Sequence, residues 1–141
     1  MSRPVAAVGA AALIVEALVI AFVNVVLGLA VKQQSMSFGG IAPKAMSAGA
    51  FVAGALFALF LLVCAALLIR IAATDRAPGR LGSVVLIVCA VVHGVLGAAV
   101  VGIVGWAAFA AAMVVLGLLV WTLLSYARNG GSTNGASPTS P

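Results

Sequence analysis

The sequence predicts an all-α protein, a four-transmembrane-helix bundle, and three observations support this fold class. Hydrophobic residues make up 65% of the 141 residues and charged residues only 6%, with a mean hydropathy of +1.35. Soluble domains carry about 25% charged residues, so this composition excludes a water-soluble fold. Four apolar segments are each long enough to form the ~20-residue helix that crosses a bilayer. Polar stretches separate the first segment from the second and the second from the third, and a short stretch with two glycines separates the third from the fourth.

The first apolar segment covers about residues 5–31 and ends at Lys32. It is much longer than the apolar core of a cleaved signal peptide and it contains Glu16, so we expect it to remain as a helix. Residues 32–47 (KQQSMSFGGIAPKAMS) contain glycines and a proline and form the one sizeable loop. The second helix is expected over about 47–71, with Ser47 as its N-cap.

The third helix is expected over about 81–101 and the fourth over about 106–126. Only GIVG, residues 102–105, joins them, and its glycines permit a reversal, so these two helices form a tight antiparallel hairpin. The four helices make one transmembrane domain, residues 1–128. The tail, residues 129–141, contains no large apolar side chain, so we expect it to be disordered.

Positive charges predict the orientation. With four spans, one side of the membrane carries both termini and five of the seven cations, Arg3, Arg70, Arg76, Arg80 and Arg128, whereas the other side carries Lys32 and Lys44. This excess predicts that both termini are cytoplasmic, in the cell (inner) membrane. The cations form no basic stripe, which argues against nucleic acid as a partner. Trp106 and Tyr126 are expected to be interfacial anchors without a binding function.

Glu16 and His93 are the candidate buried polar pair. A charged group at the bilayer centre costs about 2.5 to 3.5 kcal/mol on insertion scales, so such a residue indicates pairing or function. Glu16 lies 11 residues beyond Val5 and His93 lies 12 beyond Leu81, so both fall near the midplane. A proton could move between them without changing the net charge, so three alternatives are open: a structural pair, a simply protonated Glu16, or a transport or proton-relay role. Asn24, a secondary polar residue, is expected to hydrogen-bond a neighbouring helix.

Small residues predict close helix packing, because association in lipid depends on the approach of backbones. The second and third helices carry small residues at steps of four and are expected to pack closely. The candidate packing residues are Gly54, Gly94, Gly97 and Ala98. Packing within one chain and a homodimer interface both remain open.

The sequence contains no pattern that indicates an enzyme, a cofactor or a metal site. His93 is the only histidine, and Cys64 and Cys89 are isolated cysteines without metal-ligand spacing. The two thiols are expected to be neighbours without a disulfide if the second and third helices pack. We therefore expect a non-catalytic membrane protein without cofactor or metal.

The layout resembles the small four-helix membrane proteins of actinobacteria, through ALIVEALV around Glu16 and RIAATDRAPGR between helices two and three. That resemblance implies a fold and no particular activity. Glu16 also resembles the first-helix glutamate of the small multidrug resistance transporters, which exchange protons for cationic drugs. Two functions are thus open: helix packing or association with the bilayer and membrane partners, or proton-coupled transport of small cationic compounds using Glu16.

Overall fold

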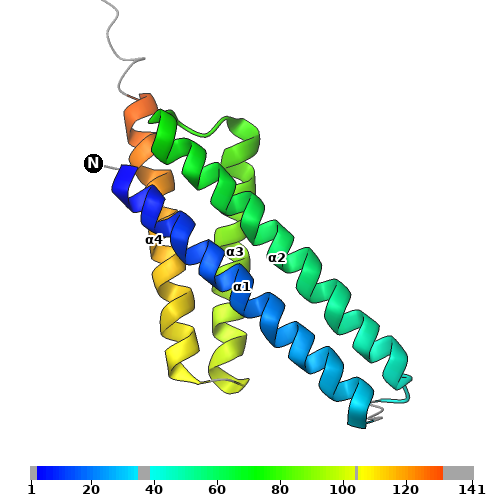
Figure 1. The fold of residues 1–141 in the computed structure, drawn as a ribbon. Coiled ribbons are helices and arrows are strands. Elements are labelled where there is room, and N and C mark those ends of the chain that lie inside the picture. Colours follow the sequence, from blue (N-terminus) through cyan, green and yellow to red (C-terminus); the bar gives the residue numbers. More distant parts are fainter. Residues whose placement is uncertain (1–2, 35–38, 104, 132–141) are drawn as a thin grey trace, which may run out of the picture. The chain divides into compact units, whose positions relative to one another are not determined.

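A computed structural model describes residues 3–34, 39–103 and 105–131 (Figure 1). The protein is all-α, as predicted. Its helices are α1 (Arg3–Gln34), α2 (Pro43–Thr74), α3 (Arg80–Ile103) and α4 (Trp106–Gly131). Each of them is long and apolar enough to cross a membrane, which indicates a multi-pass membrane protein.

The helices extend beyond the apolar runs that predicted them. α1 and α2 each contain 32 residues. At 1.5 Å per residue each helix is about 48 Å long, whereas the hydrocarbon core of a bilayer is about 30 Å thick. Such lengths are accommodated by tilting or by turns of helix outside the core. α4 continues to Gly131, so residues 129–131 are helical and not part of a disordered tail. Residues 132–141 lie outside the described residues.

The start of α2 corrects one prediction. The helix begins at Pro43, and the Ala42 carbonyl accepts hydrogen bonds from the Ala45 and Met46 amides at 2.9 and 3.2 Å. Proline suits a first helical position because the amide hydrogen that it lacks would have no partner there. Ser47 lies one turn inside the helix and is therefore not the N-cap.

The hairpin between α3 and α4 is as tight as predicted. α3 ends at Ile103, α4 begins at Trp106, and the two helices pack on each other. Gly105 has φ of 109°, a conformation that side chains with a Cβ rarely adopt. Its carbonyl accepts the Phe109 amide at 3.4 Å, which starts the α4 hydrogen-bond ladder.

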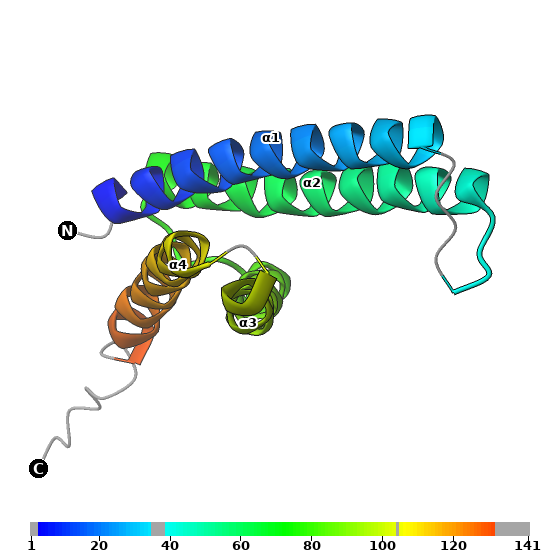
Figure 2. The same cartoon turned by 90° about the horizontal axis from the view of Figure 1, so that it is seen from below.

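The chain divides into two compact units, Leu13–Val63 and Met1–Ala12 with Cys64–Pro141. In Leu13–Val63, α1 and α2 run side by side as an antiparallel pair (Figures 1 and 2). A Cβ placed on Gly54 would lie 2.4 Å from the Asn24 Cβ, and one placed on Gly28 would lie 2.7 Å from the Phe51 ring. At Gly54 the α2 backbone therefore lies so close to α1 that a Cβ would collide with the Asn24 Cβ, whereas at Gly28 the end of the Phe51 ring fills the space beside α1.

In the second unit, α3 and α4 pack with the first turns of α1 and the last turns of α2. A Cβ on Gly9 of α1 would lie 3.3 Å from Leu68 of α2 and 3.7 Å from Leu118 of α4. The large side chains that are fully buried in this unit are Leu68, Leu86, Leu119, His93, Thr122, Cys64 and Cys89.

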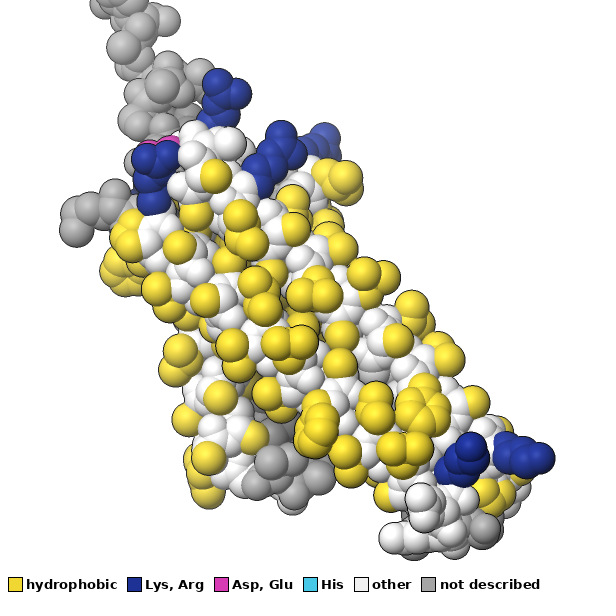
Figure 3. Space-filling model, in the orientation of Figure 1, with side chains coloured by type: hydrophobic (Ala, Val, Ile, Leu, Met, Phe, Trp, Pro, Cys, Tyr) yellow, Lys and Arg dark blue, Asp and Glu magenta, His cyan; other side chains and the backbone are white. Residues whose placement is uncertain are grey.

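Figure 3 shows apolar side chains along the flanks of the helices and lysines and arginines gathered at helix ends.

Substitution of Gly54 tests the close approach of α1 and α2. Gly54→Ala would force two Cβ atoms into overlap, and overpacking of this kind costs about 1 to 3 kcal/mol. Gly49→Ala is the matched control, since a Cβ there meets no atom within 4 Å and alanine stabilises a helix by about 0.5 to 1 kcal/mol relative to glycine. Thermal unfolding in detergent should show a lower midpoint for Gly54→Ala only. Equal midpoints for both variants would contradict the close approach.

Candidate functional site

His93 is the most deeply buried titratable side chain among the predicted site residues. It lies in the middle of α3 and is 2% exposed. Its Nδ1 is 2.8 Å from the Cys89 carbonyl oxygen and 3.7 Å from the Cys89 Sγ. Because a carbonyl oxygen can only accept, Nδ1 carries a proton and donates it. Nε2 is therefore the ring nitrogen at which His93 can gain a proton.

Cys64 and Cys89 complete a buried cluster with His93. Cys64 comes from α2 and Cys89 from α3, and the two thiols are close enough to interact, as expected for neighbouring helices. Both cysteines are fully buried free thiols. No group of three or more His, Cys, Asp or Glu is arranged to hold a metal ion within the described ranges. The cluster is thus a sealed contact between α2 and α3, with polar atoms that face one another.

Glu16 lies on α1, in the compact unit Leu13–Val63, and is half-buried. Its proposed partner His93 belongs to the unit that contains Cys64–Pro141. The pairing of Glu16 with His93 therefore stays a prediction. So does the choice between a structural pair and a proton relay.

Asn24 does not bond a neighbouring helix as predicted. Its Nδ2 donates to the Ile20 carbonyl of its own helix at 2.9 Å, while its Cβ lies against Gly54 of α2. The amide is thus satisfied locally, and the stem of the side chain makes the helix contact. In this part of the chain, a polar bond between α1 and α2 comes from Ser47, whose hydroxyl donates to the Gly28 carbonyl at 2.9 Å.

The candidate packing residues have different surroundings. A Cβ on Gly97 of α3 would lie 2.8 Å from Met113 and 3.5 Å from Ala112, so this position faces α4. Gly54 faces α1, as described above. A Cβ on Gly94 would meet no atom within 4 Å, and Ala98 is exposed. Gly54 and Gly97 therefore shape contacts within the chain, whereas Gly94 and Ala98 lie on a face of α3 without close neighbours.

A polar cluster at the end of α2, which the sequence did not predict, joins three segments. The Arg3 guanidinium of α1 donates to the carbonyls of Ala72 and Ala73 at 3.1 and 2.9 Å. These carbonyls belong to the last turn of α2, where no later amide of the helix is available to bond them. The positive charge also suits the negative end of the helix dipole. Arg3 thus caps α2 from another helix.

Asp75 is the centre of this cluster. It follows α2 with φ of 51°, and its amide bonds the Ile71 carbonyl at 2.9 Å, which is the left-handed cap of a helix end. Its carboxylate accepts the Tyr126 hydroxyl at 2.9 Å and lies 3.9 Å from Arg3 Nε. Arg3 and Asp75 are each about half exposed, so their ion pair contributes little and the Tyr126 bond is the stronger contact. Tyr126, predicted as an interfacial anchor, thereby links α4 to the turn after α2.

No family model matches this chain, and the searches of curated proteins and of solved structures found no similar protein. The site must therefore be interpreted from its own geometry.

A double-mutant cycle tests the predicted pairing of Glu16 with His93. If the two side chains satisfy each other, Glu16→Gln and His93→Leu each leave a poorly partnered polar group, at about 1 to 3 kcal/mol. The double mutant should then lose less stability than the sum of the single mutants, measured by unfolding in detergent. Strictly additive losses would contradict the pairing.

Proposed function

We propose that this chain is a non-catalytic multi-pass protein of the cell membrane, with both termini in the cytoplasm, which acts by associating with membrane partners through its helix faces. The excess of arginine on the side of the termini supports the orientation. The partner that can be tested with the chain alone is a second copy of itself.

The observation that carries this proposal is the direction of the polar side chains in the apolar helices. Asn24, His93 and Thr122 each bond the carbonyl four residues earlier on their own helix, at 2.8 to 2.9 Å. One polar atom of each of these side chains is thus bonded to the backbone of its own helix. The helices present mostly apolar side chains outward, for example Leu18, Leu56, Val91 and Val114. Such faces suit lipid or other helices.

The face of α3 that carries Gly94 and Ala98 is suited to a second helix. Small side chains let two backbones approach, and this approach drives helix association in lipid. The space beside Gly94 is open, since a Cβ there would have no neighbour within 4 Å, and Ala98 is exposed. Two copies could bring this face together around a two-fold axis, the commonest symmetry of homo-oligomers.

The alternative is a proton-coupled transporter of small cationic compounds with Glu16 as the coupling group. That function requires Glu16 to exchange its proton with water when a cation arrives. The half-buried position of Glu16 on α1 is compatible with such exchange. The two proposals differ in one respect that can be measured, namely whether Glu16 must titrate.

Counting subunits in lipid vesicles tests the association. Gly94→Leu should lower the association constant at least about tenfold, which corresponds to 1.4 kcal/mol, because the new side chain separates the backbones. Gly117→Leu on α4 is the matched control, since Gly117 also has no atom within 4 Å of its Cβ position. The measurement is photobleaching of labelled chains at a fixed protein-to-lipid ratio. A monomeric native chain would exclude the second copy as the partner, and equal dimer fractions in both variants would exclude this face.

A further inference from the structure

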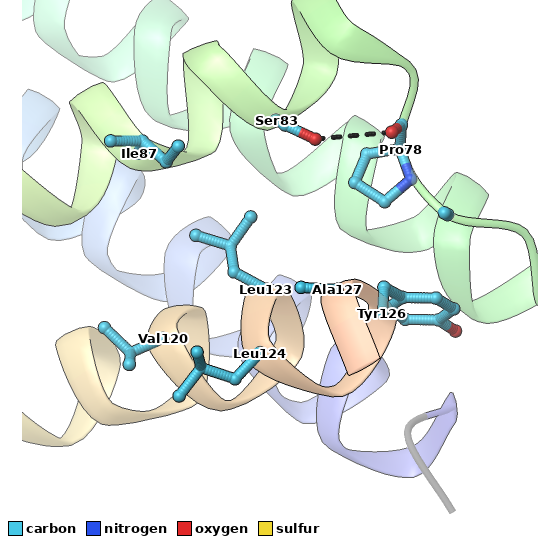
Figure 4. A pocket seen from close by; sticks show the side chains of 9 residues that line it. Pro78, Ser83, Ile87, Val120, Leu123, Leu124, Tyr126 and Ala127 are labelled. Carbon is cyan, nitrogen blue, oxygen red and sulfur yellow. Dashed lines mark hydrogen bonds between the residues drawn. The ribbon is translucent and has the colours of Figure 1, made fainter. Parts of the chain in front are cut away.

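An apolar groove lies between α3 and α4, at the end where the α2–α3 turn runs (Figure 4). Its volume is about 420 Å³, within the range of about 300 to 1,000 Å³ that is usual for ligand sites. The walls are Ile87 of α3 and Val120, Leu123 and Leu124 of α4, and Pro78 and Tyr126 lie near the turn. The whole groove belongs to the unit that contains Cys64–Pro141.

The groove offers almost no polar group to a ligand. Its one side-chain hydroxyl besides that of Tyr126 belongs to Ser83, which donates to the Pro78 carbonyl at 3.3 Å. The Tyr126 hydroxyl is engaged by Asp75. An occupant of the groove must therefore be a hydrocarbon chain, because any polar group placed there would lose its hydrogen bonds to water.

Two arginines lie close to the lining residues of the groove along the chain. Arg76 precedes the lining residue Ala77, and Arg80 begins α3 one turn before the lining residue Ser83. Both arginines are exposed, and neither guanidinium has a hydrogen bond or ion pair within the described part of the chain. Asp75, the one acidic residue of the turn, is already held by Arg3 and Tyr126. The chain thus carries two positive charges within one helical turn, in sequence, of residues that line the groove.

We propose that this groove binds an anionic phospholipid, with an acyl chain between α3 and α4 and the headgroup phosphate held by Arg76 and Arg80. A guanidinium can bond two phosphate oxygens at once. Basic residues at the edge of a cleft between membrane helices suit an anionic lipid headgroup. The apolar walls and the two arginines match the two ends of such a lipid. This inference does not depend on the association proposed above.

Native mass spectrometry of the full chain tests the proposal with phosphatidylglycerol against phosphatidylcholine, two lipids with the same acyl chains. Each arginine near an anionic headgroup contributes roughly fivefold in affinity, so two predict a preference of about 25-fold for phosphatidylglycerol. Arg76→Gln with Arg80→Gln should reduce this preference to near unity. Lys32→Gln with Lys44→Gln removes the same charge from the other connection and should leave the preference intact.

A second variant tests the apolar part of the site. Val120→Trp places a large side chain in the groove at a position that is 40% exposed, so it should fold normally. It should reduce retention of both lipids, since the acyl chain loses its place. Equal retention of the two lipids by the native chain would overturn the proposal. So would a preference that survives Arg76→Gln with Arg80→Gln, or one that is lost equally in the lysine control.

Discussion

Every hydrogen-bonding group in the hydrocarbon core of a membrane must find a partner within the protein, because lipid tails offer none. The described helices often meet this constraint within a single helix. The side chains of Asn24, His93 and Thr122 each bond the carbonyl four residues earlier. A carbonyl oxygen has two lone pairs, so it accepts the side chain in addition to the amide of the helix ladder. One polar atom of each of these residues thus finds a partner within its own apolar helix.

Because these bonds lie within single helices, contacts between helices depend mainly on the shapes of the side chains that meet. Gly54 receives the stem of Asn24 and Gly97 faces Met113, so small residues set the distance between helices along their length. Polar bonds between segments occur near helix ends, where Ser47 bonds Gly28 and Tyr126 bonds Asp75. The Ser47 bond is buried, whereas the Tyr126 bond is only partly buried, so water or headgroups can compete with the second bond. The association proposed above agrees with the same arrangement, since the outward faces are apolar.

Composition was sufficient to predict the fold class, the number of helices and the α3–α4 hairpin, because each depends on local length and hydropathy. Helix ends were predicted less well, since a helix continues into the interface after the apolar run stops, as α2 does from Pro43. The Asn24 bond was wrongly assigned to another helix because the sequence does not reveal that the Ile20 carbonyl lies within reach. The Arg3–Asp75–Tyr126 cluster was missed because it joins residues 51 or more positions apart. One available signal was that Asp75 is one of only two acidic residues in the chain.

If the polar groups within the helices serve structure alone, the purified chain should release no proton when a cation is added. Tetraphenylphosphonium, a small lipophilic cation, would be added to the protein in weakly buffered detergent while the pH is recorded. We expect no release beyond that of a Glu16→Gln variant, because a structural carboxyl need not exchange its proton when a cation arrives. Stoichiometric release that Glu16→Gln abolishes would contradict the structural role and establish Glu16 as a coupling group.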